Sequence, residues 1–436
     1  MKKYPFLKHF FKINFSLIHL LSLFTSCSIN KQISKQANSL LLKDSAISTG
    51  HIGISIYEPA TGKYWYNYDA TKYFVPASNT KLFSLYAGLK YLGDSLPGLR
   101  YELGSDSNLL IQPTGDPTFL HPEFSQPVYQ FLSNYKWITF TNAKFTDDFL
   151  GRGWAWDDYK ESYLTQRSNF PVYGNLITIK KNGNDVNFSP GSFQYHIAPN
   201  TNLLNGFDIE KKWDSNIIGI TAGTNQLLYV PITPNITGII AMLRDTLHKP
   251  VIPALDNNRK LKNLFRSQPS DSLFKPMMHR SDNFYAEQTL MMASNELLGY
   301  MNDGKMIDTI LNTDLKDIPQ KPKWVDGSGL SRYNLFTPQS FVYILSKMKN
   351  EFGLERLKNI LPTGGEGTIT AYYKKDAGFI FAKTGTLSNH CALSGFIITK
   401  KNKLLIFSVL ANHYQTGATP VRRAVEKFLS AIREKY

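Results

Sequence analysis

Cysteine is scarce in this chain, and its histidines do not follow a metal-binding pattern. Two cysteines among 436 residues exclude a disulfide framework and a cysteine-rich metal cluster. The nine histidines form neither a His-Glu-x-x-His nor a His-x-His pair, so no zinc site is indicated. With 42% hydrophobic and 19% charged residues, the chain is too apolar to be disordered. Its length predicts two or three domains, or one large domain with an insertion.

Acidic residues are also few, at 34 against 49 lysines and arginines, which gives a formal net charge of +15. An excess of this kind favours solubility and attracts polyanions. Neither a basic run nor zinc-finger spacing is present, so nucleic acid is not supported as a partner. An anionic envelope polymer or a membrane surface fits the charge equally well.

Long hydrophobic runs are absent, and the apolar stretch at residues 15–24 is too short to span a bilayer. It follows a basic segment, so residues 1–26 are predicted to be an export signal. The small residues before Cys27 resemble a bacterial lipobox, which predicts lipidation of Cys27 and a membrane contact through that lipid alone. The alternative is a plain signal peptide with an incidental cysteine. Residues 27–48 are polar at their start and are interpreted as a tether.

The remaining sequence alternates between strand and helix patterns. Strand-like alternation covers residues 51–74, 378–383, 392–399 and 403–410, and helical spacing covers residues 81–92, 236–247, 283–298, 338–349 and 420–434. Residues 91–235 contain short apolar runs among Gly, Pro, Asn and Asp, which is typical of a β-rich insertion. We therefore predict one α/β domain, residues 49–90 and 236–436, that is split by this insertion.

A Ser-x-x-Lys motif, Ser78 to Lys81, begins the first helical pattern. Three-residue spacing places both side chains on one helix face, where a desolvated lysine can take the proton of a serine nucleophile. The motif alone has little specificity, because it also begins at Ser28, Ser133, Ser272 and Ser346.

Two further motifs make the Ser-x-x-Lys motif more specific. Ser281-Asp282-Asn283 precedes a helix, where by itself it is a good N-cap, and Lys383-Thr384-Gly385 ends a strand-like run. The order Ser-x-x-Lys, Ser-x-Asn, Lys-Thr-Gly is the motif set of penicillin-recognising serine enzymes.

The segments around these motifs (PASNTKLF, SDNFYAEQ and AKTGTL) resemble those of the class C low-molecular-mass penicillin-binding proteins. These are D-alanyl-D-alanine carboxypeptidases and endopeptidases. GDPTF, WAWDD, DGSGLSRYN and ALSGFI are similar as well, so the resemblance extends from about Ile52 to the C-terminus. The family places extra domains between the first two motifs, which agrees with the 203 residues that separate Ser78 from Ser281.

The resemblance implies a serine β-lactamase/transpeptidase-like fold, an antiparallel sheet covered by helices, in the periplasm or cell envelope. The implied substrates are peptidoglycan peptides, with β-lactams as covalent mimics, and the implied chemistry uses no metal or organic cofactor. The implied catalytic residues are Ser78, Lys81, Ser281, Asn283 and Lys383, and the implied substrate-binding residues are Thr384, Gly385 and Thr386. Lys383 is expected to supply a fixed positive charge to the peptide's terminal carboxylate.

Three alternatives remain open from the sequence. A β-lactamase of the same fold requires a group that activates the deacylating water, and no such group is identified. A non-catalytic peptidoglycan-binding protein is expected to have degenerate motifs, whereas these are complete. A general esterase is disfavoured because the chain has no Gly-x-Ser-x-Gly elbow.

Overall fold

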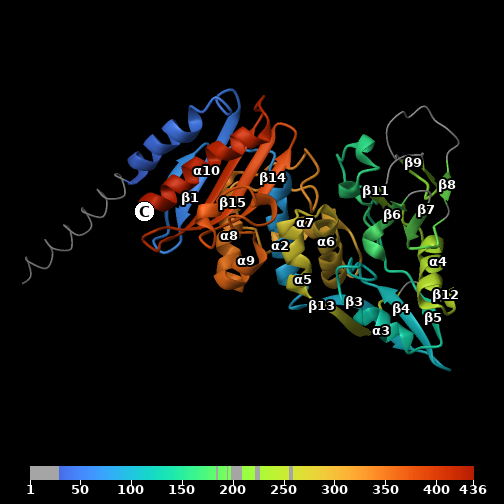
Figure 1. Ribbon diagram of the computed structural model, residues 1–436. Coiled ribbons are helices and arrows are strands. Elements are labelled where there is room, and N and C mark those ends of the chain that lie inside the picture. Colours follow the sequence, from blue (N-terminus) through green and yellow to red (C-terminus); the bar gives the residue numbers. More distant parts are fainter. Residues whose placement is uncertain (1–28, 183–184, 194, 198–208, 221–225, 255–258) are drawn as a thin grey trace, which may run out of the picture.

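The computed structural model describes residues 29–182, 185–193, 195–197, 209–220, 226–254 and 259–436. The predicted export signal and Cys27 lie outside the described residues. Figure 1 shows two parts: a main domain, which contains both the blue and the red ends of the described chain, and an inserted region on the right.

A five-stranded sheet with strand order β14-β15-β16-β1-β2 forms the centre of the main domain. All neighbouring strands in it are antiparallel. The strands are β1 (His51–Glu58), β2 (Lys63–Tyr68), β14 (Ile380–Leu387), β15 (His390–Ile398) and β16 (Leu404–Asn412). Because β1 pairs with β16, the two ends of the sequence build one sheet. The predicted antiparallel sheet is confirmed.

One face of this sheet is covered by helices that carry much of the functional site. They are η2 (Ala77–Thr80), α2 (Lys81–Tyr91), α5 (Ser270–His279), α6 (Asn283–Leu298), α7 (Asp303–Asn312), α8 (Pro338–Phe352) and α9 (Leu354–Ile360). Alternate strand residues, such as Phe381 and Phe396, join these helices in one apolar core. The intervening residues, such as Ile380 and Ile397, face a second core on the other side, as the two-residue period of a strand requires.

The second face is covered by α10 (Ala418–Lys435) and by an N-terminal helical segment. Residues 29–37 are helical and continue into η1 (Asn38–Leu42), and this segment lies beside α10 in Figure 1. Ile33, Ala37 and Leu41 are fully buried there. The interpretation of residues 27–48 as a tether is therefore wrong for the described part. The apolar residues recur every four positions, and burying them against the sheet and α10 stabilises the helix.

The inserted region is β-rich, as the sequence indicated. Its largest sheet has the order β12-β5-β4-β3-β13, formed by Val251–Pro253, Trp137–Phe140, Asn108–Pro113, Ser95–Leu103 and Asn263–Pro269. Helices α3 (Pro127–Ser133) and α4 (Ile236–Leu247) share its core. Because α4, β12 and β13 complete this unit, the inserted region extends to Pro269, beyond the predicted boundary at residue 235.

Two small sheets and several short helical turns complete the inserted region and the loops. The small sheets are β11-β6-β7 (Gln226–Pro231, Leu176–Asn182, Asp185–Ser189) and β8-β10-β9 (Tyr195–Ile197, Ile218–Ile220, Ile209–Lys211). The 3-10 turns are η3 (Trp156–Asp158), η4 (Ser162–Leu164), η5 (Tyr173–Asn175), η6 (Gly367–Ile369) and η7 (Lys374–Asp376). Within the described ranges, no helix is both long and apolar enough to cross a membrane.

Candidate active site

Ser78 and Lys81 meet where η2 runs into α2. Ser78 lies in η2 and Lys81 is the first residue of α2, and the Lys81 Nζ atom donates a hydrogen bond of 2.9 Å to Ser78 Oγ. Helical geometry places residues three apart on one face, so the local sequence determines this contact. Ser78 is half-buried and lines a cavity, whereas Lys81 is fully buried. The pair has the arrangement of a nucleophile and its base.

Helix α6 brings the second motif to the same lysine. Lys81 Nζ donates to Asn283 Oδ1 at 2.6 Å and to the backbone oxygen of Ser328 at 2.7 Å. These two acceptors hold the Lys81 ammonium group next to Ser78. The Ser328 carbonyl was not predicted as a site group, although it lies in the Asp-Gly-Ser-Gly segment that the sequence indicates to be a turn.

Strand β14 brings the third motif. Lys383 Nζ donates to Ser281 Oγ at 2.9 Å and to its neighbour's backbone oxygen, Thr384 O, at 2.8 Å. Ser281 has φ +61°, a left-handed conformation that costs free energy for a non-glycine residue. Each of the two serine hydroxyls therefore contacts one buried lysine, and the five predicted catalytic residues converge as the sequence suggested.

Burial changes the proton affinity of both lysines. It lowers the pKa of Lys81 to about 8, although Asp326, Asp282 and Glu287 act in the opposite direction. Burial also lowers the pKa of Lys383 well below its usual value, and the positive charges of Lys81 and Arg422 add to that effect. Both shifts have the same chief cause, because burial penalises the charged form of each lysine.

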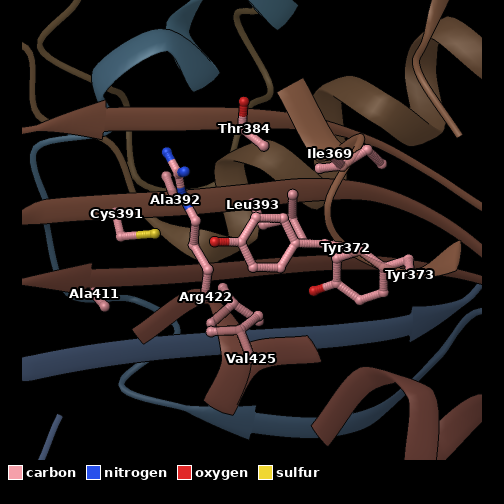
Figure 2. Close-up of a pocket in the computed structure, with 11 residues that line it drawn as sticks. Ile369, Tyr372, Tyr373, Thr384, Cys391, Ala392, Leu393, Ala411, Arg422 and Val425 are labelled. Carbon is pink, nitrogen blue, oxygen red and sulfur yellow. The ribbon is translucent and has the colours of Figure 1, made fainter. Parts of the chain in front are cut away.

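The three predicted substrate-binding residues occupy different positions. Gly385 lies directly against the nucleophile turn, where an added Cβ would be 2.4 Å from Pro76 O and 3.1 Å from Ser78 N. Thr386 is exposed and lines the cavity. Thr384 points to the α10 side of the sheet, where it lines a small apolar pocket (Figure 2) and donates to Thr368 Oγ1 at 2.7 Å. Thr384 does not line the cavity, and its side chain faces the opposite side of the sheet from that of its neighbour Lys383.

The cavity at Ser78 has a volume of about 550 Å³. Its other lining residues come from β14, α6, the Asp326 turn and the inserted region: Gly153, Ala155, Asp158, Tyr163, Leu164, Ser281, Asn283, Gly329, Leu330, Arg332, Thr386, Leu387 and Ser388. A second cavity of about 460 Å³ shares Tyr163, Ser281 and Asn283 with it. The two cavities therefore adjoin at these three residues.

A buried ionic cluster behind Lys81 was missed by sequence reasoning. Arg167 of the inserted region contacts Asp303 at α7, Asp147 (3.3 Å) and Glu287 of α6 (3.5 Å). Glu287 Oε1 accepts from the backbone N–H of Ser328 at 2.7 Å, and burial together with Asp326 raises the pKa of Glu287 to about 7. The cluster therefore links the inserted region to the carbonyl that holds Lys81. No local pattern signals it, because its members are far apart in sequence.

The described residues contain no group of three or more His, Cys, Asp or Glu side chains arranged to hold a metal ion. What the site offers chemically is a hydroxyl nucleophile, a lysine of lowered pKa, a second serine hydroxyl and an open cavity. This set suits acyl transfer.

Comparison with known proteins agrees with this chemistry. A profile of the D-Ala-D-Ala carboxypeptidase 3 (S13) family matches residues 33–201 and 256–432. The chain is 23% identical to a D-alanyl-D-alanine carboxypeptidase from Actinomadura sp. (strain R39), over 87% of this chain and 81% of the relative. It is also 23% identical to the D-alanyl-D-alanine carboxypeptidase DacB from Haemophilus influenzae, over 80% of this chain and 83% of that protein.

Solved structures agree on the fold. Penicillin-binding protein 4 from Haemophilus influenzae superposes with a TM-score of 0.72 at 20% identity, covering 92% of this chain and 99% of that chain. The predatory peptidoglycan endopeptidase Bd3459 from Bdellovibrio bacteriovorus superposes with a TM-score of 0.51 at 12% identity, covering 88% of this chain and 93% of that chain.

Proposed function

Because the chain belongs to the D-Ala-D-Ala carboxypeptidase 3 (S13) family, we propose that it hydrolyses D-alanyl-D-alanine bonds of peptidoglycan stem peptides through an acyl-enzyme on Ser78. The observation that carries this proposal is the distance of 2.9 Å between Lys81 Nζ and Ser78 Oγ. Lys81 is also fully buried. A lysine whose pKa lies near 8 is partly neutral at neutral pH, and only the neutral amine accepts a proton.

Acylation begins when Ser78 Oγ attacks the carbonyl carbon of the penultimate D-alanine. Lys81 takes the hydroxyl proton, and Asn283 holds the resulting ammonium group. The oxyanion binds the backbone N–H groups of Ser78 and Thr386, which are preorganised donors for the developing charge. Gly385 supports this geometry, since only a glycine permits β14 to lie so close to Ser78.

The C–N bond then breaks, and the terminal D-alanine leaves as an amine after it receives a proton. Ser281 is the group that delivers this proton, because its hydroxyl is bonded to Lys383 and lines the same cavity. The proton that Lys81 took from Ser78 replaces it, so Lys81 is again neutral. Water hydrolyses the ester that remains on Ser78, and Lys81 serves as the base for that water. A β-lactam mimics the substrate, and we expect it to leave a long-lived adduct on Ser78. The structure of a Haemophilus influenzae relative complexed with a β-lactam supports this use of the fold.

The test uses the purified protein with a fluorescent penicillin, followed by intact mass over time. We expect one stable adduct on the wild type and none on Ser78→Ala. Ser272→Ala is the matched control, because Ser272 begins another Ser-x-x-Lys sequence but is exposed on α5, so it should label normally. Rapid drug hydrolysis by an unmodified wild type would indicate a β-lactamase instead. Neither an adduct nor hydrolysis would indicate a non-catalytic peptidoglycan-binding protein.

We also propose that the chain is exported to the cell envelope and that Cys27 is lipidated. The basic segment, the short apolar run and the small residues before Cys27 support this. Intact mass of the mature protein should give an N-terminus at Cys27 that carries the mass of a lipid, and Cys27→Ser should abolish membrane association. An unmodified N-terminus at another residue would contradict lipidation and leave export unchanged.

A further inference from the structure

Arg422 on α10 lies on the face of the sheet away from the catalytic lysines. Figure 2 shows its side chain extending across the sheet near Cys391 and Tyr372, with the guanidinium nitrogens toward β14. The guanidinium carbon lies 5.9 Å from the centre of the Tyr372 ring. Arg422 is half-buried, and the hydrogen bond that its Nη2 atom makes to Thr386 lies in an exposed position.

The guanidinium reaches the rim of the active-site cavity. Arg422 Nη2 donates a hydrogen bond to Thr386 Oγ1, and Thr386 lines the cavity together with Ser78. A threonine hydroxyl that accepts from arginine keeps its own hydrogen for another acceptor. Arg422 and Thr386 therefore present adjacent donors at the end of β14, next to the nucleophile.

The positive charge of Arg422 has no anionic partner in the described part of the chain. No carboxylate there forms an ion pair with it, and its Nε atom is buried without a hydrogen-bond partner. Burial raises the pKa of the neighbouring Cys391 thiol, so this thiol stays neutral and does not compensate the charge. The adjacent Arg423, by contrast, pairs with Glu426.

Arg422 also differs from Lys383 in the permanence of its charge. A guanidinium is not deprotonated in proteins, whereas burial and the nearby charges hold the pKa of Lys383 well below its usual value. Lys81, Lys383 and Arg422 each contact a hydroxyl that lines the cavity, those of Ser78, Ser281 and Thr386, and of the three only the arginine is charged under all ordinary conditions. Arg332 lines the cavity as well, but it contacts Ser388 O and His390 instead. A substrate with a terminal carboxylate supplies the anion that Arg422 lacks.

We propose that Arg422 is a specificity-determining residue that binds, together with the Thr386 hydroxyl, the free terminal carboxylate of the peptide. This inference rests on the proposed function. The guanidinium supplies charge-assisted hydrogen bonds to the carboxylate oxygens, and the Thr386 hydroxyl adds one more. The carboxylate is anchored beside the N–H of Thr386, which holds the scissile carbonyl at Ser78. Arg422 acts on substrate choice and takes no part in proton transfer.

The test compares ligands that differ only in this carboxylate. Acylation rate constants are measured by intact mass for benzylpenicillin and for its methyl ester, and kcat/KM is measured for diacetyl-L-Lys-D-Ala-D-Ala. We expect Arg422→Gln to lower the rates for both free acids by about 10- to 100-fold, the worth of hydrogen bonds to a charged group. The rate for the methyl ester should change by less than about twofold, so the acid-to-ester ratio falls. Arg422→Lys should restore part of the ratio.

Arg423→Gln is the matched control, because it removes a charge from the same helix turn without reaching β14, and it should leave the ratio unchanged. A distorted site would slow the acid and the ester equally, so an unchanged ratio in Arg422→Gln overturns the role of Arg422. If the wild type itself neither forms an adduct nor cleaves the peptide, the proposed function fails instead.

A second measurement needs no variant and therefore does not depend on how Arg422→Gln folds. Phenylglyoxal modifies accessible arginines, and peptide mapping reports the modification of Arg422 and Arg423 separately. Acylation by benzylpenicillin should protect Arg422, acylation by the methyl ester should not, and Arg423 should react equally in both adducts. Equal modification of Arg422 in the two adducts would overturn the inference.

Discussion

At the scale of single residues, the site depends on lysines that burial makes less basic. Lys81 lies between Ser78 Oγ, Asn283 Oδ1 and Ser328 O, and all three are neutral acceptors. Such acceptors orient the amine and provide no full negative charge to offset the loss of hydration. Removal from water is therefore the chief cause of the lowered pKa of Lys81.

This environment predicts how acylation depends on pH. Because the pKa of Lys81 is lowered to about 8 and only the neutral amine is the base, the acylation rate should rise with pH. It should reach half of its plateau near pH 8. Benzylpenicillin acylation followed from pH 6 to pH 10, with circular dichroism as the control for folding, measures the profile. A rate that stays flat over this range would contradict Lys81 as the titrating base.

Gly385 gives a second prediction at this scale. In Gly385→Ala the new Cβ would lie 2.4 Å from Pro76 O, so β14 must move away from Ser78. Because small displacements of reacting groups are costly, the acylation rate should fall by about 10- to 100-fold. The control is Gly417→Ala, where no atom lies within 4 Å of the added Cβ. Equal rates for the two variants would contradict the close approach.

At the scale of elements, the ends of helices and strands position the catalytic groups. Ser281 and Asn283 flank the start of α6, where the Asp282 side chain accepts from the Tyr285 backbone N–H at 3.0 Å. The cap therefore fixes the first turn of α6 and, with it, the amide that contacts Lys81. The Ser-x-Asn motif is at once an N-cap and a part of the site.

The cap can be tested by comparison with another helix. Asp282→Ala should destabilise the protein by about 1 kcal/mol, as loss of an N-cap does, and should also slow acylation, because Asn283 loses its position. Asn235→Ala removes the cap of α4, where Asn235 Oδ1 accepts from Gly238 N at 2.7 Å. It should cost a similar free energy of unfolding without changing acylation. Urea unfolding measures the stability of both variants, and the acylation assay measures their rates. Normal acylation by Asp282→Ala would contradict the role of the cap in positioning Asn283.

At the scale of the whole molecule, the inserted region takes part in the site as well as in the fold. It contributes Gly153, Asp158 and Tyr163 to the cavity. It also contributes Arg167, whose side chain reaches the acidic groups of α6 and α7. Burial of this cluster stabilises the contact only while the arginine balances its carboxylates.

Removal of Arg167 should therefore be costly. Arg167→Met leaves Asp147, Glu287 and Asp303 without their cation and should lower the free energy of unfolding by about 3–5 kcal/mol at pH 8. The loss should be smaller near pH 5, because protonation neutralises buried carboxylates whose pKa is already raised. Urea unfolding at both pH values measures this.

The control for Arg167→Met is Lys400→Ala. Lys400 pairs with Glu434 where both side chains are exposed, and loss of such a pair costs about 0–1 kcal/mol at either pH. If Arg167→Met were no more destabilising than this control, the cluster would not be a structural link between the two parts.

The sequence by itself determined the main helices and strands and the three short motifs. These features depend on residues two to four positions apart, so the periods of strands and helices express them directly. The contact between Ser78 and Lys81 belongs to this class, because both residues lie on one helical turn. The convergence of Ser281 and Lys383 with this pair followed from the resemblance to a family.

Only the tertiary structure decided on which face of the sheet each side chain lies and how its surroundings shift its proton affinity. It turned Thr384 toward α10, docked residues 29–42 on the sheet, extended the inserted region to Pro269 and brought Arg167 and Arg422 to the site. Each outcome depends on partners far away in the sequence. Burial, proton affinity and strand position arise from such long-range packing, and no local pattern of side chains specifies them.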